Sequence, residues 1–208
     1  MQDAGHTPPV EEKPRRFLIH FSVMLLWILG AGVSWRAQAI EIGSKTGNFQ
    51  LLDTSGATKS LQSYSGRLVV FVFWSFKCPL SLAYNDRMEE LRSKYAGKNV
   101  AVVAIASGAN ETLSEILANV ENLKIKIPVL LDTEANAAKK LGATHIPSVF
   151  VIDENGVLRY RGAFDNNKKA GEKGRISYIE NALDSLLSGQ PVPVPETRVF
   201  GCIIKSGK

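Results

Sequence analysis

The chain has few of the residues that hold metals or bind nucleic acids. It contains two cysteines and three histidines among 208 residues, and neither a Cys-x-x-Cys nor a His-x-x-x-His pair occurs. Closed zinc sites use these spacings, so a structural metal is not expected. Basic residues exceed acidic residues by only five and aromatic residues make up 8% of the chain. This balance excludes the clustered positive charge of a nucleic-acid-binding domain.

The amino-terminal segment, residues 1–39, has the order of an export signal. Three basic residues end at Arg16, and the 19 residues 17–35 that follow carry no charge. Basic residues stay on the cytoplasmic side while the apolar stretch enters the membrane, and Ala37-Gln38-Ala39 offers the small residues that signal peptidase requires. We therefore expect a signal peptide. An uncleaved membrane anchor is the alternative, because 19 residues lie at the lower limit for crossing about 30 Å of hydrocarbon.

Export would set the redox conditions of the mature chain. Both cysteines, Cys78 and Cys202, lie after the signal. In an oxidising compartment such as the periplasm a disulfide between them would persist. The predicted location is therefore extracytoplasmic, with membrane contact only through the amino-terminal segment.

Hydrophobic periodicity predicts strands that alternate with helices. Two continuous apolar runs, 68–73 and 100–105, are typical of strands covered on both faces. Beyond Pro79, apolar residues recur at helical spacing and predict one long helix. Its predicted buried face consists of Tyr84, Met88, Leu91 and Tyr95.

Hairpins and short helices complete the pattern. Asn155-Gly156 lies between the apolar segments 148–152 and 157–162 and predicts a β-hairpin, because Asn-Gly supplies the positive φ angles of a tight turn. Other predicted elements are a hairpin turning at 54–56 between 48–53 and 60–64, a strand at 128–131, and helices over 113–120, 134–141 and 176–187. We expect one three-layer α/β/α domain with a mixed central sheet and an amino-terminal hairpin extension.

The most informative segment places Cys78 between a buried strand and a helix. Pro79 suits the first helical position, where its missing N–H costs nothing. Unpaired N–H groups and the positive end of the helix dipole favour thiolate over thiol, and Lys77 adds positive charge. We predict a reactive thiol; a buried free thiol or a structural half-cystine is the alternative.

Further motifs accompany Cys78. They are Phe73-Trp74 through Cys78-Pro79, then His145-Ile146-Pro147-Ser148-Val149-Phe150, then Asp153-Glu154-Asn155-Gly156-Val157-Leu158 with Arg161-Gly162. With them the sequence resembles the thioredoxin-like superfamily, in particular its exported redoxin branch of AhpC/TSA and TlpA-like thiol-disulfide oxidoreductases. The resemblance runs from about Phe49 to Leu187, so we expect this domain over residues 40–189, followed by an extended tail over 190–208.

The resemblance implies where a substrate would bind. It implies that the Ile146–Pro147 bond is cis and that its loop faces the reactive sulfur. Trp74, Pro79, Ile146 and Pro147 would then contact the substrate. Without the resemblance, a trans Pro147 that merely starts a strand is equally consistent with the sequence.

Three departures limit what the resemblance carries over. Ser81 stands where the second thiol of a local Cys-x-x-Cys pair belongs, and Val72 replaces the usual buried acid. Phe71 and Ser75 stand where the peroxiredoxin pattern has Pro and Thr. A local disulfide is therefore impossible, and the prediction of peroxidase activity is weaker. Ser75, Ser81 and Lys77 are expected only as supporting residues.

The second sulfur, Cys202, lies in the tail. As a resolving thiol it would displace a mixed disulfide or sulfenic acid formed on Cys78. The Gly-Cys-x-Ile-Lys ending resembles that of exported redoxins with a Cys-Pro site and no second local thiol. The alternative is a permanent staple that closes a loop of 123 residues, worth about 5 kcal/mol by chain entropy.

The sequence thus predicts a thiol-disulfide oxidoreductase in which Cys78 is the nucleophile and Cys202 the resolving thiol. It would act on protein or small-molecule disulfides, take electrons from a dithiol reductant and need no cofactor. The alternatives are a thiol peroxidase acting on hydroperoxides with the same sulfurs, and a non-catalytic binding module with a structural disulfide.

Other polar residues carry less weight. His145 is a candidate for proton transfer near the Pro147 loop, although a lone loop histidine is more often solvated. Arg87 and Arg161 are candidates for favouring an anion, with a solvated surface charge as the alternative, particularly for Arg87. Asp165-Asn166-Asn167 with Glu172 lacks the spacing of a calcium loop and is expected to be an exposed loop.

Overall fold

The computed structural model describes residues 39–108, 111–167 and 175–205. These residues belong to one compact unit, Ala37–Lys208. All of the predicted export segment except its last residue lies outside the described ranges, and so does Glu172. In the described ranges every helix is too short or too polar to cross a lipid bilayer.

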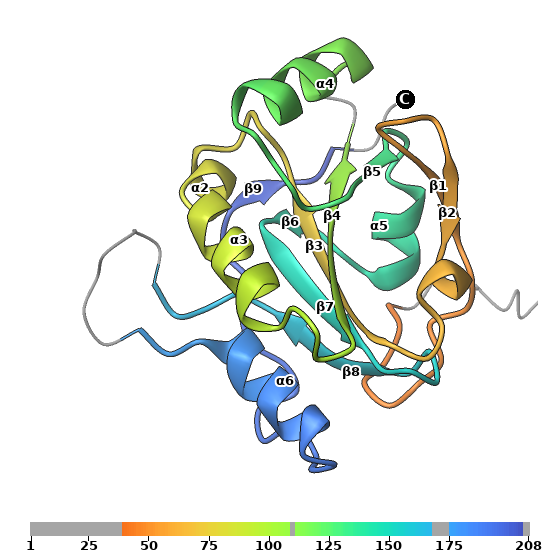
Figure 1. Ribbon diagram of the computed structural model, residues 1–208, viewed down its shortest axis with the longest axis vertical. Coiled ribbons are helices and arrows are strands. Elements are labelled where there is room, and N and C mark those ends of the chain that lie inside the picture. The colour runs from red at the N-terminus through yellow and green to blue at the C-terminus, as the bar shows by residue number, and fades with distance from the viewer. Residues whose placement is uncertain (1–38, 109–110, 168–174, 206–208) are drawn as a thin grey trace, which may run out of the picture. The chain divides into compact units, whose positions relative to one another are not determined.

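A mixed sheet forms the centre of this unit, in the order β2-β1-β5-β4-β3-β7-β8 (Figure 1). Its strands are β1 (Gln50–Asp53), β2 (Thr58–Ser60), β3 (Leu68–Trp74), β4 (Val100–Ser107), β5 (Val129–Asp132), β7 (Ser148–Ile152) and β8 (Leu158–Gly162). β3, β4 and β5 run parallel, while the β1–β2 hairpin and the β7–β8 hairpin are antiparallel. Every residue of β3 and β4 is buried, as expected for strands covered on both faces.

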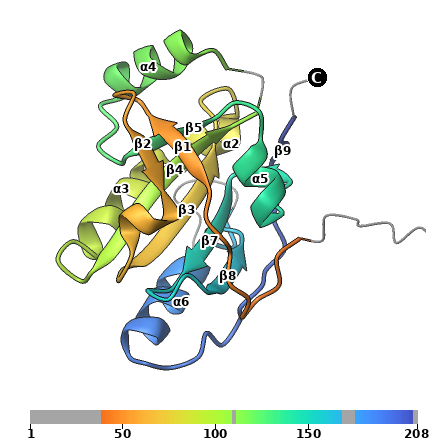
Figure 2. The same ribbon diagram turned by 90° about the vertical axis from the view of Figure 1, so that its right-hand side faces the viewer.

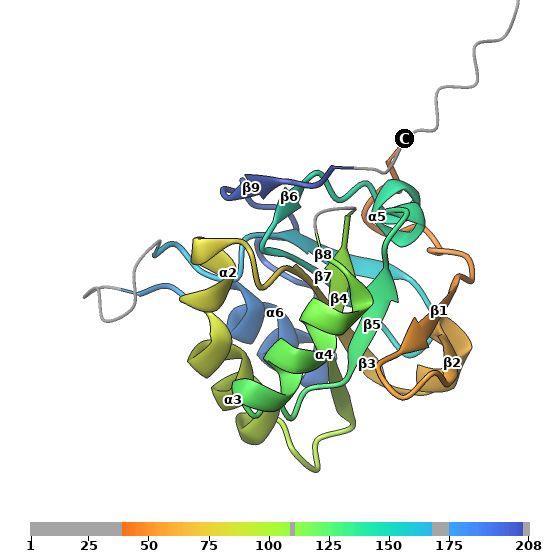
Figure 3. The same cartoon turned by 90° about the horizontal axis from the view of Figure 1, so that it is seen from above.

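Helices cover the two faces of the sheet. α3 (Asn85–Lys94) and α6 (Tyr178–Leu187) lie on one face and α5 (Asn136–Leu141) lies on the other (Figure 3). Tyr84, Met88, Leu91 and Tyr95 are all buried, so the predicted apolar face of the helix after Pro79 is confirmed. The three-layer α/β/α architecture is therefore the one the sequence predicts.

The helix after Pro79 differs from its prediction in one respect. It is divided into a single turn, α2 (Pro79–Leu82), and the longer α3, with Tyr84 at the junction. The Tyr84 hydroxyl lies 3.1 Å from a carboxylate oxygen of Asp165, a residue of the loop after β8. The helix is therefore divided at the residue whose hydroxyl bonds to the buried Asp165 carboxylate, outside the helix.

Three local predictions need correction. In α4 (Leu113–Asn122) Ile116 is buried and Val120 packs partly buried against the core, whereas Leu113 and Leu117 are exposed, so only half of the predicted apolar stripe packs. In the β7–β8 turn only Gly156 has a positive φ, because the Asp153 carboxylate accepts from the backbone N–H groups of Asn155 and Val157 and shapes the turn instead. The predicted strand at 60–64 is largely a 3-10 helix, η1 (Leu61–Tyr64).

The carboxyl-terminal tail crosses the end of the unit that carries Cys78. Its short strand β9 (Cys202–Ile203), labelled in Figure 2, pairs antiparallel with β6 (His145–Ile146) (Figure 3). Earlier in the tail, Thr197 donates its N–H to Arg161 O at 3.1 Å and its hydroxyl accepts from Ala163 N at 2.9 Å. A Cβ atom on Gly162 would lie 2.1 Å from the Thr197 hydroxyl oxygen, so only glycine permits this close approach.

The Gly162→Ala substitution tests this anchor of the tail. We expect it to lower the free energy of unfolding by about 3 kcal/mol, because it combines a positive φ with steric overlap. The matched control is Gly189→Ala, where φ is also positive but no atom lies within 4 Å of the added methyl group. The control should lose about 1 kcal/mol in urea unfolding. Equal losses in the two variants would contradict close packing of the tail at β8.

Candidate functional site

Cys78 ends a tight turn that begins where β3 leaves the sheet. Its N–H donates to Ser75 O at 3.3 Å, and the Ser75 hydroxyl accepts from Lys77 N at 3.1 Å. Cys78 is then the cap residue of α2, with extended backbone angles. Ser75, predicted as a supporting residue, thus holds the backbone that carries the sulfur.

Glu111 holds the same turn from the segment that follows β4. Its side chain is almost fully buried, and one carboxylate oxygen accepts from Phe76 N at 2.8 Å. Sequence analysis did not select this residue. A signal existed, however, because parallel strands end at the same edge of a sheet, and Glu111 follows β4 as Cys78 follows β3.

The two sulfurs and the proline loop meet at one point. Cys78 and Cys202 form a disulfide, with their Cα atoms 6.2 Å apart. The Ile146–Pro147 bond is cis, as the resemblance implied, and the carbonyl oxygen of Ile146 lies 3.5 Å from Cys78 Sγ. Ile146 is also the strand partner of Cys202. The tail cysteine therefore lies against the backbone that precedes the cis-proline.

Burial in this disulfide-bonded form differs among the predicted substrate contacts. Cys78 is only 2% exposed and Cys202 is half-buried, whereas Pro79 is exposed. Trp74 is fully buried, its ring packed against Phe76 with centroids 4.2 Å apart. In this form Trp74 thus offers no surface to a substrate. Ile146 and Pro147 are likewise buried.

Polar atoms without partners lie next to the site in the sequence. Ser81 Oγ, Trp74 Nε1 and Ser148 Oγ are buried with no hydrogen-bond partner in the described part of the chain. Ser81 lies one helical turn after Cys78, Trp74 ends β3, and Ser148 follows Pro147. An unsatisfied buried polar group costs about 1–3 kcal/mol. Three of the four such atoms among the described residues thus lie within four residues of Cys78 or Pro147 in the sequence.

Lys77, whose positive charge was expected to favour the Cys78 thiolate, forms an ion pair with Glu115 instead. Its ammonium group lies 2.8 Å from a carboxylate oxygen of Glu115 in α4. The hydrogen bond from Lys77 and then that from the Thr112 backbone lower the pKa of Glu115 to about 2. Glu115 therefore stays ionised at any ordinary pH and keeps Lys77 paired. Since α2 is a single turn, the helix dipole at Cys78 is also smaller than that of the long helix predicted from the sequence.

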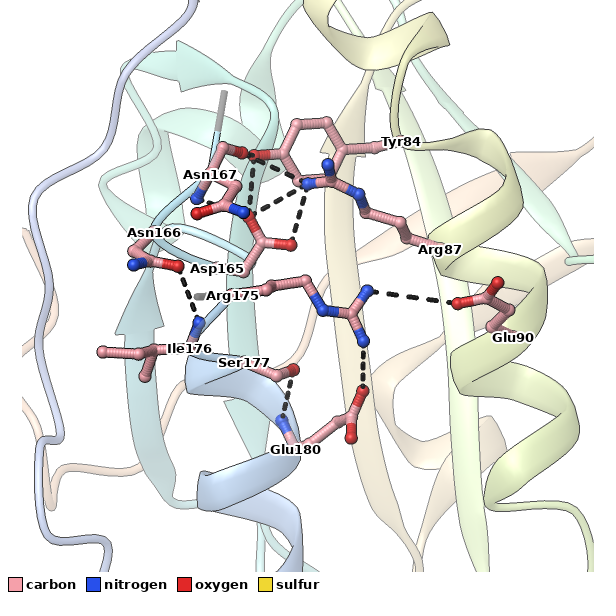
Figure 4. A network of polar contacts seen from close by, with 10 residues as sticks. All are labelled: Tyr84, Arg87, Glu90, Asp165, Asn166, Asn167, Arg175, Ile176, Ser177 and Glu180. Carbon is pink, nitrogen blue, oxygen red and sulfur yellow. Dashed lines mark hydrogen bonds and ion pairs between the residues drawn. The ribbon is translucent and has the colours of Figure 1, made fainter. Parts of the chain in front are cut away.

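A buried ion pair lies beside α3, and it corrects two expectations (Figure 4). One guanidinium nitrogen of Arg87 lies 3.0 and 2.8 Å from the two oxygens of Asp165, which is wholly buried. Arg87 is thus not a solvated helix charge. The segment expected to be an exposed loop is instead buried at Asp165 and Asn167, and Asn166 alone is exposed.

Tyr84 extends this network. Its hydroxyl lies within hydrogen-bond distance of Asp165 and of Asn167 O, and the Arg87 guanidinium lies 4.5 Å from its ring centroid. Burial, followed by the charge of Asp165, raises the pKa of Tyr84 and keeps the phenol protonated. The network joins α3 to the loop after β8.

The remaining polar candidates also have structural partners. His145 is the first residue of β6, and its ring nitrogen Nδ1 lies 2.9 Å from the Thr144 hydroxyl. Arg161 pairs with Glu196 of the tail at 2.9 Å and donates to Ile40 O at 2.8 Å. Arg161 thus holds the tail and Ile40 in place, whereas the His145 ring contacts its sequence neighbour.

One hollow lies along the tail next to the site. It has a volume of about 540 Å³ and is lined by His145, Asn166 and Tyr178 together with tail residues from Thr197 to Gly201. Another hollow of about 520 Å³ is lined by Leu68, the first residue of β3. Since Cys78 follows the other end of β3, this second hollow is not part of the site.

The buried ion pair can be tested without touching the sulfurs. We expect Arg87→Met to lower the free energy of unfolding by about 3–5 kcal/mol, because it leaves the Asp165 carboxylate buried without a counter-ion. Arg92→Met is the matched control, since Arg92 pairs with Glu89 on the outer part of the same helix. It should cost no more than about 0.5 kcal/mol.

The double variant Arg87→Met/Asp165→Leu removes both charges and should recover most of that loss in urea unfolding. A single Arg87→Met variant as stable as the control would contradict the burial of the pair.

Comparison with known proteins adds relatives to this geometry. Thiol-disulfide oxidoreductase ResA of Bacillus cereus is 29% identical over 144 residues, covering 65% of this chain and 82% of the relative. Thiol-disulfide oxidoreductase ResA of Bacillus subtilis is 25% identical over 151 residues, covering 70% of this chain and 83% of the relative.

Solved structures give the same fold. A hypothetical protein from Sinorhizobium meliloti superposes with a TM-score of 0.74 at 28% identity, covering 82% of this chain and 97% of that chain. An uncharacterized protein from Geobacillus kaustophilus has a TM-score of 0.73 at 26% identity, covering 80% of this chain and 93% of that chain.

A family model, described as the AhpC/TSA family, matches residues 42–161, more than half of the chain. The match includes the Cys78 turn, the cis-proline loop and the β7–β8 hairpin. The exposed lipoprotein thioredoxin Etrx1 of Streptococcus pneumoniae superposes with a TM-score of 0.55 at 23% identity, covering 69% of this chain and 99% of that chain, so the fold is thioredoxin-like. The chain therefore belongs to the AhpC/TSA family.

Proposed function

We propose that this protein is an exported thiol-disulfide oxidoreductase in which Cys78 is the nucleophile and Cys202 the resolving thiol. One observation carries the proposal: the disulfide between Cys78 and Cys202 lies directly against the cis Ile146–Pro147 loop. A purely structural disulfide does not require this loop. The ResA relatives, which are named thiol-disulfide oxidoreductases, support the same reaction class.

The reaction proceeds in two exchanges. The Cys78 thiolate attacks one sulfur of a substrate disulfide, forms a mixed disulfide with it and releases the other sulfur as a thiolate. The Cys202 thiolate then attacks Cys78 Sγ, releases the second substrate thiolate and leaves the Cys78–Cys202 disulfide. The substrate gains two electrons and the protein loses two. A dithiol reductant, by two further exchanges, restores both thiols.

The neighbouring groups fit this chemistry. The turn that carries Cys78 is held by Ser75 and Glu111, so the sulfur keeps its position when the tail leaves. In the thiol form, Cys78 Sγ can donate to Ile146 O. Lys77, whose side chain is exposed, pairs with Glu115 and is given no role in activating Cys78.

Peroxide reduction with the same sulfurs has less support. Arg87 and Arg161, the cations that could favour an anionic thiolate or a peroxide oxygen, pair with Asp165 and Glu196 respectively. The experiment below distinguishes peroxidase activity from disulfide exchange.

We also propose the division of the chain that the sequence indicates. Residues 1–39 form the export signal or anchor, residues 40–189 form the thioredoxin-like domain, and 190–208 form the tail with Cys202. In a periplasmic location the oxidised form described above would be a resting state that a dithiol reductant opens.

A single-turnover experiment tests the assignment of both sulfurs. The reduced protein is mixed with one equivalent of disulfide-bonded insulin without added reductant. The reaction is then quenched in acid, and the masses of the products are measured by mass spectrometry. The wild-type protein should end as the Cys78–Cys202 disulfide with reduced insulin. Cys202→Ser should stop at a mixed disulfide with insulin, and Cys78→Ser should form neither product.

Under turnover with dithiothreitol, Cys202→Ser should be slower by at least about 100-fold, because a tethered thiol is replaced by one from solution. Two results would contradict the proposal. One is catalytic, Cys78-dependent consumption of hydrogen peroxide without insulin reduction. The other is a Cys202→Ser variant that no longer folds, which would indicate a structural staple.

A further inference from the structure

The tail places an extended strand next to the reactive sulfur. In the β6–β9 ladder, Ile146 faces Cys202 and His145 faces Ile203, and Ile204 N donates to Thr144 O at 3.0 Å. The strand β6 ends at the cis-proline, and its last carbonyl lies 3.5 Å from Cys78 Sγ. The segment from 201 to 204 therefore has the form of an extended peptide whose cysteine is bonded to Cys78.

The residue before the bonded cysteine has no room for a side chain. Gly201 has a φ of +149°, and a Cβ atom there would lie 1.9 Å from the carbonyl oxygen of Ile146. Real Cβ atoms do not approach an oxygen so closely, and the oxygen belongs to backbone fixed next to the cis-proline. Any other residue at this position would have to lift the strand away from β6.

The residues after the cysteine alternate in exposure. Ile203 is 66% exposed, so its side chain points into solvent. Ile204 is half-buried and packs against the core. The position directly after the cysteine thus accepts many side chains, whereas the second position after it favours an apolar one.

We propose that the tail is an internal copy of the substrate and occupies the edge of β6, beside Cys78, where substrates bind. By this inference, which rests on the proposed function, the preferred substrates are polypeptides with an extended Gly-Cys-x-apolar segment. On reduction of the Cys78–Cys202 disulfide the tail leaves β6, and the substrate segment pairs with β6 in its place. The substrate class is therefore protein disulfides whose attacked cysteine directly follows a glycine.

The tail can leave β6 while Cys202 stays close to Cys78. Once the disulfide is open, β9 is held by its two-residue ladder, one further backbone hydrogen bond and the packing of the half-buried Ile204 side chain. Each hydrogen bond is worth about 1 kcal/mol. The upstream anchor at Thr197 is independent of the sulfurs, because it binds Arg161, Ala163 and Tyr160. The five residues that follow Thr197, up to Cys202, span at most about 17 Å. Cys202 therefore remains in reach of the mixed disulfide that it resolves.

Matched peptides test the glycine requirement. The Cys202→Ser protein, reduced at Cys78, is mixed with Phe-Gly-Cys-Ile-Ile-Lys or Phe-Ala-Cys-Ile-Ile-Lys, each activated at cysteine with a thionitrobenzoate group. Release of the coloured thiolate measures attack by Cys78. The glycine peptide should react at least tenfold faster than the alanine peptide. Free glutathione, as the control nucleophile, should attack both at the same rate.

A third peptide, Phe-Gly-Cys-Ile-Asp-Lys, tests the second position after the cysteine and should react more slowly than the parent glycine peptide. Equal rates for the glycine and alanine peptides, with normal reaction of Cys78 toward glutathione disulfide, would overturn this inference and leave the proposed function standing. Failure of Cys78 to react with glutathione disulfide and with every peptide would overturn both.

Discussion

The contact of three backbone segments at the Ile146 carbonyl is the constraint on which the site depends. Cys78 approaches this oxygen from the end of β3, Cys202 pairs with the same residue from the tail, and Pro147 fixes its orientation through a cis bond. A sulfur held at this point is placed to exchange with a disulfide that approaches along β6. The fold serves to bring the three segments together.

The sheet topology brings these segments together. Buried parallel strands end at one edge of the sheet, so the turns that follow them become neighbours. This places Glu111 beside the Cys78 turn and anchors it through Phe76 N. The cis-proline loop comes from β7, the antiparallel neighbour of β3. The tail, in contrast, is distant in sequence from the other two segments, and the hydrogen bond between Thr197 and Ala163 N anchors it to the domain.

Much of this arrangement could be predicted from local patterns. The apolar run of β3 and the Cys78-Pro79 pair each carry a signal within a few residues, and both lie where the sequence predicts. Residues that depend on distant partners could not be assigned in this way. Arg87 and Asp165 read separately as surface charges, because their pairing across 78 residues is invisible in either segment. The division of the helix at Tyr84 and the pairing of Lys77 with Glu115 arise from tertiary contacts for the same reason.

The proposed function requires a Cys78–Cys202 disulfide that opens and closes under physiological thiol conditions. The most direct test is its reduction potential, measured by equilibrating the protein with glutathione buffers and trapping the thiols in acid for mass analysis. A redox-active pair should have a potential between about −270 and −120 mV, the range of thioredoxin-fold oxidoreductases. A potential below about −300 mV, typical of permanent structural disulfides in exported proteins, would contradict the account.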